Sequence, residues 1–226
     1  MGASLWHVRK ALLSEMGNMN GSTGVIEAVQ NREAIMAQKP GQLSLLVVWT
    51  AASLLAATQL GAQDTKSMRV SVQPEQQRML APEFSLKDAR GTSVRLSAYR
   101  GHVVLLDFWA TACGGCVKEI PAFVEIAQAY RGRGLATVGV SEDILYEDLK
   151  GPDEAWSRVN PFVRDHKIPY AVLMGNDQVT GAYGIKALPL TYLLDTSGRI
   201  AAIYAGVVDR ANLEANINLL LRESKK

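Results

Sequence analysis

The sequence predicts an α/β protein with a mixed central sheet, helices on both faces, and a C-terminal antiparallel hairpin followed by a last helix. Three observations lead to this fold class. Short apolar runs alternate with helix-spaced patterns from Leu80 onward, 103–109 is a continuous apolar run suited to a buried strand, and 190–206 holds two apolar runs around a Thr-Ser-Gly turn. The length of 226 residues, 48% of them hydrophobic, allows one domain with extensions or two small domains.

Residues 1–42 are expected to form an N-terminal extension outside the main domain. They mix charged residues with Gly and Asn, and they are too long for the basic region of a secretory signal. Met36 can itself begin a conventional leader. The part before it is then either a mis-assigned start or a cytoplasmic tail.

Residues 43–62 form an apolar run without a single charge, long enough to cross a bilayer as a helix. The run is compatible with two interpretations: a retained membrane anchor, or a secretory signal that is cleaved after Ala62. A buried globular helix is disfavoured because no amphipathic pattern accompanies the run. No cysteine stands directly after this run, which excludes a lipid-modified cysteine at a cleavage site there. Residues 63–79, polar and rich in Gln, are expected to be a linker, so that the domain proper is 80–226.

The first half of that domain reads as strand, helix, strand. Residues 103–109 form a strand interrupted only by Asp107, and 136–141 form the next one. Between them 113–131 has helical spacing. Its apolar face consists of Ile120, Phe123, Ile126, Ala127 and Tyr130.

The second half continues the alternation and ends on an antiparallel pair. The charged stretch containing Trp156 and Phe162 predicts one helix, followed by a strand at 171–174 and a short helix at 177–183. The hairpin comes next, with its turn at 196–199. Asp209 can then cap a closing helix that runs through Arg222, with an inward face of Leu213, Ile217 and Leu220.

Charge excludes one class of function. The chain carries a net charge of +2, with no basic stripe or block, so nothing indicates nucleic-acid binding. No internal repeat or low-complexity segment is present, and we expect a monomer.

The chemistry is predicted to lie at the only two cysteines, Cys113 and Cys116, which follow the 103–109 strand and begin a helix. Backbone N–H groups and the helix dipole favour an anion there, which lowers the thiol pKa of Cys113 and makes it a nucleophile. We expect Cys113 to be the exposed attacking thiol. Cys116, one turn later, is expected to be buried and to resolve a mixed disulfide.

Three other uses of a cysteine pair fit less well. A purely structural disulfide across so short a loop restrains little of the unfolded chain. A zinc site lacks a second cysteine pair, and His7, His102 and His166 lack ligand spacing. Covalent haem attachment requires a histidine at the position of Val117. Redox cycling is therefore the favoured use, with no cofactor or metal beyond the cysteine pair.

Two stretches carry a family resemblance. The segment "FSLKDARGTSVRLSAYRGHVVLLDFWATACGGCVKEIPAF" resembles the thioredoxin superfamily, and within it the exported TlpA/ResA branch of thiol–disulfide oxidoreductases; "AYGIKALPLTYLLDTSGRI" is similar to the cis-proline segment of that family. The match covers about Pro82 to Leu221. It implies a thioredoxin-like fold and reduction of disulfides on the outer side of the bacterial inner membrane, where several members serve cytochrome c maturation.

The resemblance also implies roles for single residues. Cys113 matches the nucleophile and Cys116 the resolving thiol. Asp107 matches the buried acid of ordinary thioredoxins, where this branch more often has Asn, and Glu119 matches an acid of the ResA-like members. A carboxyl under the helix can take the proton of Cys116. The alternatives are a strand residue with a satisfied polar contact for Asp107 and a solvated helix residue for Glu119.

Pro189 matches the cis-proline that flanks the disulfide. The residues expected to contact the substrate are Trp109, Gly114, Gly115, Leu188 and Pro189. The sequence departs from the family in three places: Ala112 stands where Trp is usual, Gly115 replaces Pro, and the apolar Leu188 precedes the cis-proline. These departures bear on redox potential and partner choice.

The sequence therefore predicts an enzyme that reduces protein disulfides through the Cys113/Cys116 dithiol, either anchored or secreted at the periplasmic or extracytoplasmic face of the inner membrane. Its expected partners are protein thiols or disulfides and a membrane electron donor upstream. A peroxiredoxin-like thiol peroxidase is the first alternative, although Ala110 stands where such enzymes need Thr. A redox-inert binding module with the same fold is the second.

Overall fold

The structure is a computed structural model that describes residues 67–225. The expected extension (1–42), the apolar run (43–62) and residues 63–66 lie outside this range. Within 67–225, no helix is both long and apolar enough to span a bilayer.

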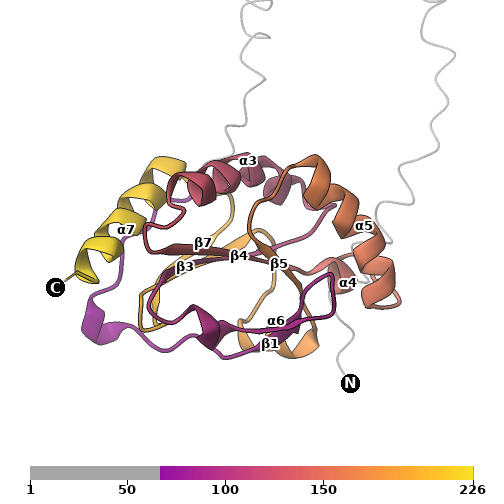
Figure 1. Ribbon diagram of the computed structural model, residues 1–226, viewed down its shortest axis with the longest axis horizontal. Helices are drawn as coiled ribbons and strands as arrows, with labels where there is room; N and C mark the ends of the chain where they lie inside the picture. The colour runs from indigo at the N-terminus through magenta and orange to yellow at the C-terminus, as the bar shows by residue number, and fades with distance from the viewer. Residues whose placement is uncertain (1–66, 226) are drawn as a thin grey trace, which may run out of the picture. The chain divides into compact units, whose positions relative to one another are not determined.

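A five-stranded mixed sheet in the order β5-β4-β3-β6-β7 forms the centre of the domain (Figure 1). β3, β4 and β5 are parallel, whereas β6 is antiparallel to β3 and β7 to β6. In chain order the elements are η2 (Glu75–Gln77), β1 (Ser85–Lys87), β2 (Ser93–Arg95), η3 (Leu96–Tyr99), β3 (Val103–Trp109), α3 (Gly114–Ala129), β4 (Leu135–Ser141), α4 (Asp143–Tyr146), α5 (Pro152–Asp165), β5 (Ala171–Met174), α6 (Asp177–Ala182), β6 (Leu190–Leu194), β7 (Ile200–Ala205) and α7 (Arg210–Glu223). The predicted fold class is confirmed.

Both faces of the sheet are covered, which explains why β3 is apolar throughout. All seven of its residues are buried. The helices α3, α5 and α7 lie on one face, and α6 lies on the other together with the small β1–β2 sheet (Figure 1). Because side chains alternate along a strand, Asp107 points to the α3 side with Leu105 and Trp109, while Leu106 and Phe108 point to the α6 side.

The helix predicted in the charged stretch with Trp156 and Phe162 is present as α5, but the prediction missed a second, shorter helix before it. The chain forms a short α4 and then a separate α5. Pro152 is the first residue of α5, where its missing N–H costs nothing, but it prevents a helix from continuing through Gly151. Asp148, with φ of 55°, turns the chain between the two helices.

The sequence patterns also did not predict the β1–β2 hairpin. Its turn is held by Asp88, whose Oδ1 accepts hydrogen bonds from the backbone N–H groups of Arg90 and Thr92. Gly91 has φ of 78°, a left-handed conformation that favours glycine. An Asp three residues before a Gly is a turn signal that could have identified this hairpin.

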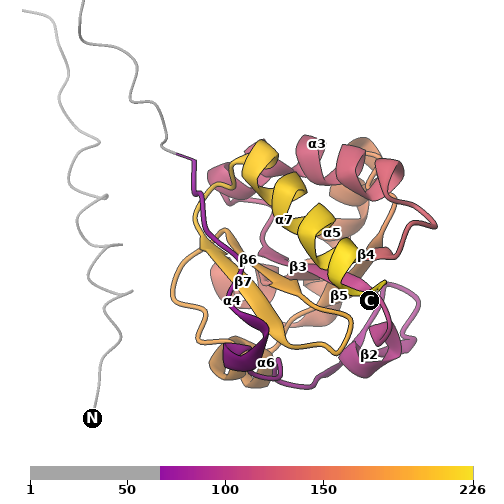
Figure 2. The ribbon, with the colours of Figure 1, turned by 90° about the vertical axis from the view of Figure 1, so that its left-hand side faces the viewer.

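Part of the expected linker packs on the domain. We call residues 68–80 the N-terminal strap. The N–H of Met68 donates to Val207 O, just after β7, and that of Gln73 donates to Ala201 O in β7, so that the strap lies along this edge of the sheet (Figure 2). The apolar residues Met68, Val70 and Val72 pack against the cluster beneath α7. Their alternation is a strand-like signal that the polar composition obscured.

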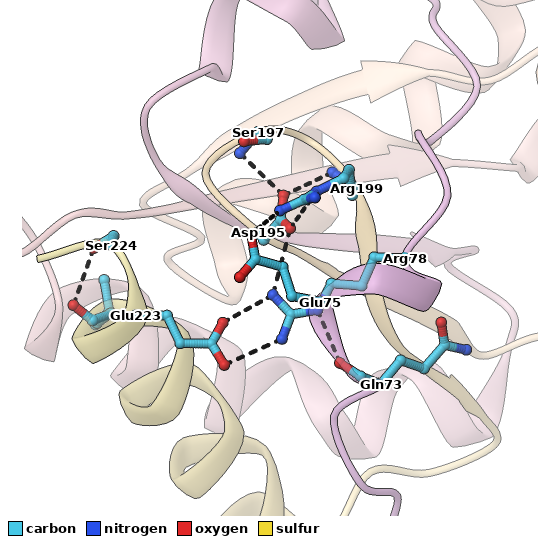
Figure 3. A network of polar contacts seen from close by, with 9 residues as sticks. Gln73, Glu75, Arg78, Asp195, Ser197, Arg199, Glu223 and Ser224 are labelled. Atoms are coloured by element: carbon cyan, nitrogen blue, oxygen red, sulfur yellow. Dashed lines mark hydrogen bonds and ion pairs between the residues drawn. The ribbon is translucent and has the colours of Figure 1, made fainter. Parts of the chain in front are cut away.

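Arg78 fixes the far end of the strap (Figure 3). Its guanidinium is 2% exposed and donates to both oxygens of Glu223, on α7, at 2.8 and 3.2 Å. It also lies 3.4 Å from Asp195 Oδ2, in the β6–β7 turn, and its Nε donates to Gln73 O. One buried cation thereby joins strap, hairpin and last helix.

Candidate active site

The two cysteines form a disulfide at the first turn of α3, where β3 ends. Cys113 is the N-cap of the helix, and its Sγ accepts a hydrogen bond from the backbone N–H of Cys116 at 3.2 Å. The predicted position of Cys113 at a helix N-terminus is confirmed. Donation from that N–H and the helix dipole both favour a thiolate at this sulfur once the disulfide is reduced.

The expectation that Cys113 is exposed is wrong for this disulfide form. Cys113 is 2% exposed and Cys116 is 1% exposed. Both belong to an apolar cluster that includes Ile120, with Leu188 packed against it. The burial arises because the segment before β6 folds back onto the cysteine turn. The exposed positions at the turn are Ala112 and Gly114.

The Leu188–Pro189 peptide bond is cis, as predicted. Pro189 is buried beside the first turn of α3: a Cβ placed on Gly115 would lie 3.0 Å from Pro189 Cδ and 3.5 Å from Val207 Cγ2. The close approach accounts for glycine at 115, because a larger residue would press against the proline ring. Of the expected substrate contacts, Gly115, Leu188 and Pro189 therefore lie around the disulfide, and Gly114 is exposed next to it.

Two buried acids lie between the sheet and α3: Asp107 on β3 and Glu119 on α3 itself. Asp107 is 2% exposed, and its Oδ1 accepts from Thr191 Oγ1 at 3.3 Å. Burial raises its pKa well above the ordinary value, and the charge of Glu119 adds to the rise. Glu119 is 4% exposed, with its Oε1 accepting from the backbone N–H of Val208. Burial raises the pKa of Glu119 to about 7, so it is not a solvated helix residue.

Tyr170, at the start of β5, is a third polar group in this region, and sequence reasoning missed it. Its ring lies over Gly139, the cross-strand neighbour of Asp107. Within 67–225 neither its hydroxyl nor Glu119 Oε2 has a hydrogen-bond partner, and both atoms are buried. Burial raises the pKa of Tyr170, and the charges of Asp107 and Glu119 raise it further. Sequence alone gave no signal for this residue, because its position depends on β4–β5 pairing.

Trp109 does not lie where a substrate contact was expected. Its side chain is 0% exposed. The indole points inward, with Nε1 over Gly139 and its ring 5.1 Å from that of Phe162 on α5. As the last residue of β3 it faces the α3 side of the sheet, which directs it into the core rather than toward the surface of the disulfide.

Two further acids, Glu142 and Asp143, lie beside the cysteine turn and were also missed. Asp143 Oδ1 and Oδ2 accept from the backbone N–H of Thr111 at 3.1 and 3.3 Å, and Thr111 Oγ1 also donates to Oδ1. Glu142 is 3% exposed, accepts from Thr180 Oγ1 at 2.6 Å, and has a pKa raised by burial to about 7. Acids directly after the second parallel strand are a signal that could have been used, because that sheet edge also carries the cysteines.

The arrangement can store two electrons as a dithiol, and it holds two carboxyls buried on the α3 side of the sheet. Among residues 67–225, no cluster of three or more His, Cys, Asp or Glu side chains suits a metal ion. The chemistry that the Cys113–Cys116 pair supports is thiol–disulfide exchange.

Comparisons with known proteins agree with this chemistry. A model of the family described as AhpC/TSA matches residues 78–203. The chain is 31% identical over 137 residues to a thiol-disulfide oxidoreductase ResA from Geobacillus thermodenitrificans, which covers 61% of this chain and 74% of that protein. It is 29% identical to the thioredoxin-like protein YneN of Bacillus subtilis, over 70% of this chain and 86% of that one.

Comparison with solved structures also finds thiol–disulfide exchange proteins. The crystal structure of a thiol:disulfide interchange protein DsbE from Chlorobium tepidum, itself described as putative, superimposes with a TM-score of 0.54 at 26% identity. The match covers 69% of this chain and 99% of that one. These similar proteins share the fold of this chain, and the names of the ResA and DsbE proteins describe the same thiol–disulfide chemistry.

Proposed function

The chain belongs to the AhpC/TSA family within the thioredoxin superfamily and is a thiol–disulfide oxidoreductase of the ResA/DsbE type, and we propose that it works as a reductant of protein disulfides outside the cytoplasm. The observation that carries the proposal is the Cys113–Cys116 disulfide, with Cys113 as the N-cap of α3 and Pro189 beside it.

In the proposed reaction the reduced Cys113 thiolate attacks one sulfur of a substrate disulfide. A Cys113–substrate disulfide forms, the substrate S–S bond breaks, and one substrate sulfur leaves as a thiolate. Cys116 then gives its proton to Asp107 and attacks Cys113 Sγ, which releases the second substrate thiolate and forms the Cys113–Cys116 disulfide. Two electrons pass to the substrate. A dithiol donor, proposed to be a membrane protein, must return them to the enzyme.

The proposed direction rests on the residues between the cysteines. Strong oxidants of this superfamily stabilise their reduced form. Gly114 and Gly115 offer no charge or imidazole that would do so here. Repulsion from ionised Asp107 and Glu119 is a weaker argument than the sequence suggested, because burial raises both pKa values and favours the neutral carboxyls. The Gly114–Gly115 pair is therefore the main support for the proposed direction, in which the protein reduces its substrate.

Export is supported by the charge-free run at 43–62, which suits a membrane anchor or a secretory signal. An oxidising compartment is also where a disulfide reductase needs a dedicated electron supply. The similarity to ResA and DsbE proteins is consistent with a role in cytochrome c maturation, which we include in the proposal.

Two measurements test the function. The Cys116→Ser variant should accumulate mixed disulfides through Cys113, whereas Cys113→Ser should not; the reverse pattern would exchange the two roles. Equilibration of the purified protein with a glutathione series should give a potential below about −200 mV, against about −120 mV for the strongest oxidant of this superfamily. A value near the latter would reverse the direction, and rapid peroxide consumption would favour the peroxidase alternative.

A further inference from the structure

The turn that carries Cys113 is held from the neighbouring strand as well as by its own helix. Residues 110–113 connect β3 to α3, and the N–H of Cys113 donates to Ala110 O at 3.1 Å across the turn. From the end of β4, the N–H of Glu142 donates to Trp109 O at 2.7 Å. Asp143 accepts from both the backbone and the side chain of Thr111, two residues before the nucleophile.

Asp143 is itself rigidly placed. It is 0% exposed, and its Oδ2 accepts from Ser141 Oγ at 2.8 Å. Its own N–H donates to the same hydroxyl at 3.4 Å. Hydrogen bonds to an ionised acceptor are roughly twice as strong as those between neutral groups. A buried carboxylate with several donors is therefore a firm point of attachment for the turn.

On the other side of the nucleophile the first turn of α3 supplies the restraint, with Cys113 O accepting from the backbone N–H of Val117 at 3.0 Å. Gly114 and Gly115 follow Cys113, and glycine restricts the backbone least. A Cβ on Gly114 would meet nothing within 4 Å, so packing does not restrain that position either. In the oxidised protein the disulfide itself fixes the turn. After reduction that covalent restraint is absent, and the hydrogen bonds between Thr111 and Asp143 remain.

We propose that Asp143 is a positioning residue for Cys113: by holding Thr111, it keeps the reduced Cys113 sulfur at the N-cap, where the N–H of Cys116 stabilises the thiolate. The inference deepens the proposed function and rests on it, because it identifies what makes the first cysteine reactive. Asp143 acts through Thr111 and does not touch the reacting sulfur.

Thr111→Val tests the proposal with little change of shape, because Val is β-branched and lacks only the hydroxyl. The readout is the rate of Cys113 alkylation by iodoacetamide from pH 4 to 10, in the full chain carrying Cys116→Ser so that one thiol reports. We expect the Cys113 thiol pKa to rise and alkylation below that pKa to slow by about three- to tenfold. Because this variant keeps the backbone hydrogen bond of residue 111 to Asp143, unchanged profiles in both Thr111→Val and Asp143→Ala would overturn the proposal.

Thr180→Val is a matched control. It makes the same substitution and removes the same kind of bond, from a Thr hydroxyl to a buried carboxylate, but the acceptor is Glu142 and the donor lies on α6. Its alkylation profile should match that of the Cys116→Ser parent. If Thr180→Val slows alkylation as much as Thr111→Val does, the effect is general loosening and the proposal is wrong.

Asp143→Ala separates positioning from charge. Loss of a nearby negative charge alone would favour the thiolate and speed alkylation, whereas loss of positioning slows it. We expect slowing, with thermal unfolding recorded to show that each variant is folded; faster alkylation would contradict the proposal. The alkylation rate does not depend on whether the enzyme reduces or oxidises its substrates. A wild-type protein that fails to reduce protein disulfides would therefore refute the proposed function, and the comparison of the alkylation rates would still test the role of Asp143.

Discussion

Glu119 and Glu142 are acids whose burial makes folding depend on pH. Each has a pKa raised to about 7, from an ordinary value of 4.5. Between these values the unfolded chain has released the proton that the folded protein still holds, so stability falls as pH rises from about 4.5 to about 7 and then levels off. Each carboxyl accounts for roughly 3 kcal/mol of this loss.

Glu142→Gln should remove one of the two contributions while leaving the cysteines intact. Urea unfolding of the oxidised protein at pH 4.5, 6 and 8 should show a shallower decline than in the wild type, with the variant gaining relative stability at pH 8. A variant that follows the wild-type curve at all three pH values would show that Glu142 titrates normally.

Other residues mark what local sequence can and cannot reveal. The cysteine pair and the cis bond at Pro189 were predicted because a motif of adjacent residues carries each of them. The burial of Cys113 was not, since Leu188 covers it from a distant part of the chain. The contact of Asp143 with Thr111 likewise depends on β3–β4 pairing, which no local pattern specifies.

At the level of elements, periodicity predicted what the core dictates. The strands at 103–109 and 171–174 are confirmed as predicted, and α3 begins one residue after its predicted start. Each has an apolar face long enough to identify it. The packing of the N-terminal strap was not predicted, because its polar composition obscures the alternating apolar residues, and its hydrogen bonds to β7 and α7 use the backbone of the strap, which leaves little trace in composition.

Arg78 should be essential to the attachment of the strap. Removing one partner of a buried ion pair typically costs about 3–5 kcal/mol, because the remaining charges lose their compensation. Glu223 is one-third exposed and can regain water, so Arg78→Met should cost less, about 2 kcal/mol. Denaturant unfolding measures this loss, and Arg199→Met, which removes a more exposed arginine of the same network, is the control.

The expected signature of Arg78→Met is lower stability with unchanged Cys113 alkylation, because Arg78 lies at the end of the strap away from the cysteines. Equal losses in the two arginine variants would mean that burial of Arg78 adds nothing. A change in alkylation would show that the strap influences the turn.

For the whole molecule, the proposed location outside the cytoplasm makes a direct prediction. A reporter enzyme that is active only after export, fused after Arg78, should be active, because residues 1–78 include the complete apolar run. The same fusion without residues 43–62 should be inactive. Activity confined to a cytoplasmic reporter would refute the proposed location.

The start of the N-terminal strap limits how far the domain can lie from a membrane anchor at 43–62. Met68 pairs with Val207 and Val208, and Val208 in turn donates to Glu119 while Val207 lies against Gly115. Met68, near the start of the described chain, thus lies at the disulfide end of the domain. Five residues lie between Ala62 and Met68, and the six Cα–Cα steps that join them reach at most about 20 Å. If 43–62 is retained in the bilayer as proposed, so short a connection keeps the domain close to the lipid surface, and membrane-embedded electron donors would be met by lateral diffusion in two dimensions.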